Sequence, residues 1–126
     1  MKLNKDRIYS RLYGYTYKLK IVSIVRSEAE IIQFIFNMLI EHKNIATVKS
    51  NLDFYQFRNR SKKRFSISEI KGMIRPIYAG ITVGFLGFNI TSRFYQPIVS
   101  IQTYKKARRI LESINNAPIA QVPKAS

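Results

Sequence analysis

A run of cations is the most chemically distinctive feature of the sequence. Five Lys or Arg side chains fall within the seven positions 58–64, and no acidic residue lies among them. Positive side chains at this density suit ionic contacts with the phosphates of a nucleic acid. The whole chain of 126 residues carries 22 Lys and Arg against 7 Asp and Glu, a net charge of +15 that favours a polyanionic partner. We therefore expect phosphate contacts from Arg58, Arg60, Lys62, Lys63 and Arg64.

A second group of cations lies near the end of the chain. The predicted last helix, Tyr104–Asn115, has apolar residues at the helical spacing that starts at Ala107 and ends at Ile114. Cations opposite such a face usually form a solvated surface. Because no acid follows them until Glu112, they are also candidates for phosphate contacts: Lys105, Lys106, Arg108 and Arg109.

The sequence has few of the residue types that commonly carry out catalysis. The chain has no Cys and a single His, His42, which excludes thiol nucleophiles and Cys-based zinc sites. The richest apolar run, Ile31–Ile40, is too short for a membrane span. The segment Gly80–Gly87 is not followed by the Lys and Ser or Thr of a phosphate loop. The composition predicts a protein that is not an enzyme, with no metal, no cofactor and no small-molecule substrate.

Hydrophobic patterning predicts an α+β fold. Aromatic and β-branched residues indicate a half-buried strand over Tyr15–Val25, with Tyr17 and Lys18 on opposite faces. A helix follows, with Ser27 as N-cap in a capping box, and ends near Lys43. The composition of Ile45–Phe57 favours two further strands with a turn near residues 50 and 51.

The second half of the chain repeats the order of residue types found in the first. A second capping box, Ser66 with Glu69, begins a helix that Pro76 limits. The segment Ile21–Ile24 recurs as Ile98–Ile101, an offset of 77 residues, and Thr103 then occupies the place of an N-cap. This predicts one basic domain over residues 1–116, with repeat one at about 12–77, a partial repeat two at about 78–116, and an extended tail at 117–126.

This order of elements resembles the LAGLIDADG homing endonucleases and maturases. Residues 17–78 carry the resemblance in the first repeat and residues 78–115 in the second. The resemblance implies a mixed antiparallel sheet with helices on one face, built as a truncated pair of β-α-β-β-α-like units. It also implies that Tyr78–Phe88 is the remnant of the family's metal-binding helix. Val83, Phe85 and Leu86 stand there in place of carboxylates, so we expect a catalytically inactive relative.

The same resemblance implies where a nucleic acid would lie. In that family the polar face of the sheet contacts the nucleic acid. Side-chain alternation and the repeat offset assign five residues to this face: Lys18, Lys20, Gln56, Arg58 and Arg93.

The sequence therefore predicts a non-catalytic, RNA-binding structural protein. A component of an organellar ribosome, located in the mitochondrial matrix, fits a small basic α+β chain, with ribosomal RNA and neighbouring ribosomal proteins as its partners. We expect RNA before DNA because RNA offers irregular shapes that such surfaces can follow. Two alternatives stay open: a LAGLIDADG-type DNA endonuclease or intron maturase, and a protein-interaction module within a large complex.

Overall fold

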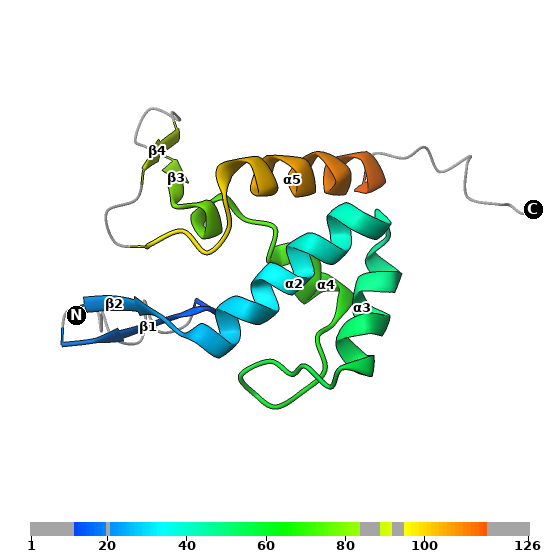
Figure 1. The fold of residues 1–126 in the computed structure, drawn as a ribbon, viewed down its shortest axis with the longest axis horizontal. Helices are drawn as coiled ribbons and strands as arrows, with labels where there is room; N and C mark the ends of the chain where they lie inside the picture. The colour runs from blue at the N-terminus through cyan, green and yellow to red at the C-terminus, as the bar shows by residue number, and fades with distance from the viewer. Residues whose placement is uncertain (1–11, 20, 84–88, 92–94, 116–126) are drawn as a thin grey trace, which may run out of the picture.

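A computed structural model describes residues 12–19, 21–83, 89–91 and 95–115 of the chain (Figure 1). The described elements are, in chain order, β1 (Tyr15–Lys18), β2 (Ile21–Ile24), α2 (Arg26–His42), α3 (Ile45–Phe54), α4 (Ile67–Gly72), the 3-10 helix η1 (Pro76–Ala79), β3 (Ile81–Val83), β4 (Asn89–Thr91) and α5 (Ile101–Asn115). The α+β class is confirmed. Among these residues no helix is long and apolar enough to cross a membrane.

Helix α2 is the centre of the molecule. In Figure 1 it crosses the middle of the view, with α5 on one side and α3 and α4 on the other. Its buried face includes Ile32, Phe36 and Leu39, which are fully shielded from solvent. Leu52 of α3 and Leu111 of α5 belong to the same core. Burial of an apolar side chain of this size contributes about 1.5–3 kcal/mol, so the three helices are held mainly by this core.

Helix α3 replaces the two strands predicted for Ile45–Phe57, and that prediction is wrong. The Asn44 side chain caps the helix by accepting the Thr47 N–H at 3.0 Å. Ile45, Val48 and Leu52 are all buried on the face that meets α2. Their spacing of three and four residues fits a helix, and packing against α2 outweighs the strand preference of β-branched residues.

The predicted strand Tyr15–Val25 is instead a hairpin. β1 pairs antiparallel with β2, and Lys18 stands opposite Ile21. The chain reverses at Leu19, whose φ of 52° lies in the left-handed region. Because the reversal changes which residues share a face, Ile21 lies beside Lys18 on the exposed side.

The predicted repeat is also wrong. Ile21–Ile24 is a strand, whereas Ile98 and Val99 form a buried connection whose N–H groups both donate to the Tyr78 carbonyl, at 2.8 and 3.0 Å. α5 then begins at Ile101. The described strands form two separate two-stranded sheets, β1 with β2 and β3 with β4, and not one mixed sheet.

The segment assigned to a remnant metal-binding helix has another structure. Tyr78 and Ala79 end η1, and Gly80 turns the chain with a φ of 75° into β3. The remaining residues of that segment, 84–88, lie outside the described part of the chain. The predicted remnant helix is therefore not present over 78–83.

Helix starts were predicted correctly at one capping box and incorrectly at the others. Ser66 and Glu69 form the full reciprocal box at α4. Ser27 lies inside α2, whose N-cap is Val25 and receives no side-chain hydrogen bond. At α5 the predicted N-cap was Thr103, but Ser100 takes that role. The Ser100 hydroxyl accepts the backbone N–H of Thr103 at 3.1 Å. The predicted box at Ser27 fails because α2 begins one residue earlier, at Arg26, so Ser27 does not hold the N-cap position.

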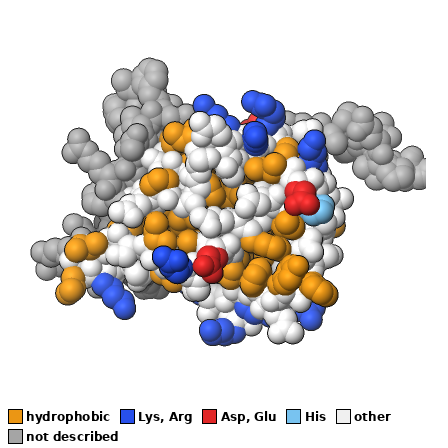
Figure 2. All heavy atoms as spheres, in the orientation of Figure 1, with side chains coloured by type: hydrophobic (Ala, Val, Ile, Leu, Met, Phe, Trp, Pro, Cys, Tyr) orange, Lys and Arg blue, Asp and Glu red, His pale blue; other side chains and the backbone are white. Residues whose placement is uncertain are grey.

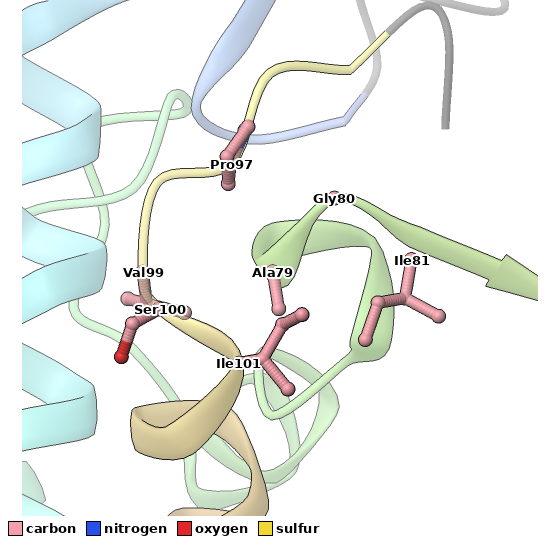
Figure 3. Close-up of a pocket in the computed structure, with 7 residues that line it drawn as sticks. All are labelled: Ala79, Gly80, Ile81, Pro97, Val99, Ser100 and Ile101. Carbon is pink, nitrogen blue, oxygen red and sulfur yellow. The ribbon is translucent and has the colours of Figure 1, made fainter. Parts of the chain in front are cut away.

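A small apolar pocket lies where η1 meets the start of α5 (Figure 3). Its volume is about 260 Å³, and most of its lining is aliphatic, with Ala79, Ile81 and Ile101 facing one another across it. Pro97 lies next to Gly80, and a Cβ added at Gly80 would be in van der Waals contact with it at 3.4 Å. No Lys or Arg lines this pocket, so it is separate from the basic surfaces.

Candidate nucleic-acid interface

The basic loop after α3 is anchored by one inward-facing cation, Arg60. Its guanidinium donates to the Glu28 carboxylate of α2 through Nε at 2.8 Å and Nη2 at 2.7 Å. Nη2 also donates to the carbonyls of Leu12, at 3.2 Å, and Tyr15. The hydrogen bonds that Arg60 donates to Glu28 are the main cause that raises the pKa of Arg60, and the negative charge of Glu28 adds to them, although partial burial acts against both. Arg60 therefore fastens the loop to α2 and to the base of the hairpin.

Glu28 has a second partner that explains its position. Its Oε1 accepts the backbone N–H of Gly14 at 2.7 Å, and its side chain is only 16% exposed. A carboxylate bound to an Arg and to a backbone N–H forms charge-assisted hydrogen bonds, which are shorter and stronger than neutral ones. Glu28 thus joins the hairpin, α2 and the basic loop at one point.

Asn59 shapes the remainder of the loop into a closed turn. Its side-chain oxygen accepts the N–H groups of Ser61, at 2.9 Å, and Lys63, at 3.0 Å. The Asn59 backbone donates to the Lys63 carbonyl at 2.9 Å, and Lys62 takes a φ of 65° at the corner. Asn59 also donates to Glu69 of α4 at 3.1 Å. The turn is therefore fixed at its base and presents its corner to solvent.

Three consecutive cations stand on this turn, and we call them the loop cluster: Lys62, Lys63 and Arg64. All three are exposed, and none forms an ion pair among the described residues. The neighbouring acid, Glu69, is already engaged. The Ser66 N–H is the main cause that lowers its pKa, and Asn59 contributes in the same direction. The positive charge of the loop cluster is therefore left for an external anion.

Three of the four cations predicted on the last helix form a second exposed group. Lys105, Lys106 and Arg109 face solvent, and we call them the α5 cluster. Arg108 instead pairs with Glu112 one turn later, at 3.0 Å. Lys43, at the C-cap of α2, lines a hollow of about 310 Å³ together with Arg109. Lys43 was not among the predicted contacts, because it stands far from the last helix in the sequence and only its charge distinguishes it.

The remaining predicted contacts do not share a surface. Lys18 is exposed at the end of the hairpin, whereas Gln56 follows α3 with a φ of 60°. Arg58 is half-buried and donates to the adjacent Phe57 carbonyl at 3.0 Å. Lys20 and Arg93 lie outside the described residues. The polar sheet face that was to hold Lys18, Gln56 and Arg58 together is therefore not formed.

The two basic groups lie at different edges of the molecule. In Figure 1 the loop after α3 is at the bottom of the view and α5 runs along the top, with α2 between them. Figure 2 shows Lys and Arg side chains along the upper edge and at the lower edge, while hydrophobic side chains gather between them over the central helix. On the face that Figure 2 shows, most of the described Lys and Arg side chains thus lie at these two edges.

Some of the aromatic residues beside the loop belong to the hydrophobic core, and others do not. Phe65 is fully buried and meets the Tyr13 ring edge-on at 5.6 Å. Phe57 packs on Phe34 at 5.2 Å, whereas Tyr55 stays 55% exposed. Of the loop's flanking rings, only Tyr55 is open enough to meet a ligand.

Buried tyrosines beneath the hairpin predict a loss of stability at high pH. Burial, followed by the Glu28 charge, raises the pKa of Tyr13 to about 12, and burial also raises the pKa values of Tyr15 and Tyr78. A raised pKa of a phenol means that its neutral form is favoured in the folded state. The corresponding stability is fully present below about pH 10 and is lost as the pH rises through the folded values.

We therefore expect the free energy of unfolding to change little through these groups between pH 7 and 9. It should then fall by roughly 3 kcal/mol per pH unit above pH 10, from Tyr15 and Tyr78 together. Urea titrations followed by tyrosinate absorbance measure this. Ionisation of all tyrosines near pH 10 without loss of folded structure would contradict it.

Comparison with known proteins identifies a family. A family model described as Recombinase matches residues 26–113, from the start of α2 almost to the end of α5. A comparison with curated proteins finds no match.

Two solved structures share the fold. One is described as the crystal structure of a LSR-DNA complex, with a TM-score of 0.73, 18% identity, and coverage of 92% of this chain and 35% of that chain. The other concerns the sequence requirements of the Listeria innocua prophage attP site, with a TM-score of 0.74, 18% identity, and coverage of 92% and 48%. The chain thus spans between a third and a half of the length of these neighbours.

These findings correct the sequence-based interpretation. The LAGLIDADG resemblance is wrong, and with it the alternatives of a homing endonuclease or intron maturase, because a different family matches most of the chain. An RNA-binding ribosomal component with ribosomal RNA as its partner is wrong for the same reason. The prediction of a protein that is not an enzyme is overturned as well, because the matching family is one of enzymes. By the extent of the match from Arg26 to Ser113, the chain belongs to the Recombinase family.

Proposed function

We propose that this chain is a DNA-holding part of a recombinase, and that it grips duplex DNA by its phosphates. The observation that carries the proposal is the loop cluster: three adjacent, exposed and unpaired cations on a turn that Asn59 and Arg60 fix in place. Family membership supports DNA as the polyanion. Strand exchange is the reaction proposed for the whole enzyme, to which this chain contributes binding.

Phosphate contact is the mode of binding that the loop favours. Lys and Arg contacts with phosphates fix the position of a protein on DNA without reading sequence. The α5 cluster, with Lys43 beside it, offers a second set of such contacts at another edge. A duplex held at either edge would displace counterions and give affinity that depends steeply on salt.

The test compares two triple variants with the same loss of charge. In the loop variant Lys62, Lys63 and Arg64 are replaced by Gln. In the control variant the replaced residues are Arg26, Lys71 and Arg75, which lie outside both clusters. Arg60 is left intact, because its replacement would release the loop from Glu28.

We expect the loop variant to reduce the slope of log affinity against log salt by about 2 to 3 units, at roughly 0.9 per phosphate contact with duplex DNA. The control should change the slope much less. A third variant, with Lys105, Lys106 and Arg109 replaced by Gln, measures how much the α5 cluster contributes to this slope. Equal slopes for the loop and control variants, measured on one short duplex by fluorescence anisotropy, would refute the role of the loop.

A further inference from the structure

The β1–β2 hairpin ends in apolar side chains that the fold does not use. Leu19 is 93% exposed and Ile21 is 62% exposed. Ile21 lies directly opposite Lys18, so the exposed face of the tip combines an aliphatic side chain and a cation. Figure 2 shows hydrophobic and cationic side chains side by side at the lower left, over the end of the hairpin.

The base of the hairpin is held by aromatic contacts and hydrogen bonds. Tyr15 is fully buried, and its ring stacks on Tyr78 at 6.1 Å and meets Tyr95 edge-on at 4.8 Å. The Tyr15 hydroxyl donates to the Gln96 carbonyl, and Val25 donates to the Gly14 carbonyl at 2.8 Å across the hairpin base. The base of the hairpin is therefore anchored to the core, and its strands project from it on the left of Figure 1.

The tip also places a leucine where the tight reversal of the hairpin needs a positive φ. A φ of 52° is unfavourable for leucine, and Gly or Asn would adopt it more easily. A strained and fully exposed leucine contributes nothing to the core of this chain. The feature becomes useful if the side chain contacts a partner.

Charge indicates what that partner is. The segment Tyr15–Val25 contains Lys18 and Lys20 and no acidic residue. A projecting ribbon of this charge is attracted to the same polyanion as the loop cluster. A two-stranded antiparallel ribbon fits the major groove of B-DNA, about 12 Å wide, but exceeds the minor groove, about 6 Å wide.

We propose that the hairpin tip enters the major groove of duplex DNA and that Leu19 packs on thymine C5-methyl groups, with Ile21 beside it and Lys18 directed to a phosphate. The methyl group of thymine is the apolar feature that the major groove offers. This inference rests on the proposed function, and it adds a base-reading contact to the phosphate contacts of the loop.

The test uses two probes that differ only in that methyl group: an alternating A·T duplex and the same duplex with deoxyuridine in place of thymidine. Both have the same phosphates and the same minor groove. We expect the wild-type chain to bind the methylated duplex about fourfold more tightly for each methyl group contacted. Leu19→Asn should bind both duplexes equally while its salt slope stays that of the wild type.

Leu19→Asn also separates binding from folding. Because Asn accepts a left-handed φ, the variant should melt about 2–5 °C higher than the wild type, so weaker binding cannot come from unfolding. Phe54→Asn is the control, since Phe54 is 76% exposed at the end of α3, away from the hairpin. It should keep the preference for the methylated duplex.

The outcomes separate the two proposals. If the wild type binds both duplexes with equal affinity and a steep salt slope, the hairpin inference is overturned and the phosphate grip stands. If Leu19→Asn retains the methyl preference, the inference is equally overturned. If neither duplex is bound at low salt, both proposals fail. Loss of the preference in Leu19→Asn alone supports the insertion of the tip.

Discussion

Replacing Glu28 by alanine is expected to lower the free energy of unfolding by about 3 kcal/mol. The variant loses two hydrogen bonds to Arg60 and one to the Gly14 N–H, and each bond to a charged group contributes roughly 1.5–3 kcal/mol. It also leaves Arg60 without its acid beside the hairpin base, and the loss of one partner from this partly buried pair adds to the cost. Urea denaturation followed by circular dichroism measures the change.

Glu112→Ala is the matched control for this prediction. It removes the same carboxylate from an exposed pair with Arg108, one helical turn away. Exposed pairs of this kind contribute only about 0.3–0.5 kcal/mol. Similar costs for the two variants would show that Glu28 is an ordinary surface acid. Glu28→Ala should also weaken DNA binding at a temperature where it is still folded, because the loop cluster loses its anchor.

The second large effect is expected from Gly14→Ala. Gly14 has a φ of 99°, which strains any residue with a Cβ. The added methyl would lie 2.6 Å from Cδ1 of Ile32 and 2.9 Å from Cδ1 of Ile98, both buried in the core. Backbone strain and overpacking each cost about 1–3 kcal/mol, so we expect a loss of about 3 kcal/mol or more.

Gly72→Ala tests the same substitution where neither cost applies. Nothing lies within 4 Å of a Cβ at Gly72, which ends α4. Alanine should stabilise the protein there by up to about 1 kcal/mol, because it loses less conformational freedom on folding. Thermal melting of the pair should therefore show shifts of opposite sign. A neutral Gly14→Ala would mean that the hairpin base can move away from α2.

Local signals in the sequence predicted the fold where the chain itself determines the structure. The box of Ser66 and Glu69 and the apolar face of the last helix are examples, since capping and helical spacing act within one element. The hairpin and α3 were not predicted, because contacts with residues far away in the sequence determine their structure. The turn at Leu19 has no Gly or Asn to mark it, and the β-branched residues of α3 resemble a strand until they pack on α2.

The candidate site was predictable as charge but not as geometry. The sequence located every cation of the loop, yet it treated Arg60 as equivalent to Lys62 and Lys63. Only the fold brings Glu28, 32 positions earlier, against Arg60 and turns that side chain inward. Lys43 and Arg109 likewise line one hollow only because α2 packs on α5.

The closed turn at Asn59 determines how the loop can meet its partner. A flexible basic segment must lose conformational entropy when it binds, whereas this turn is ordered by its own hydrogen bonds during folding. Its cations therefore act as a preformed template with a fixed spacing between positive charges. Under the proposed phosphate grip, such a template would favour a backbone whose phosphates repeat at a matching interval, so the shape of the nucleic acid as well as its charge would set the affinity.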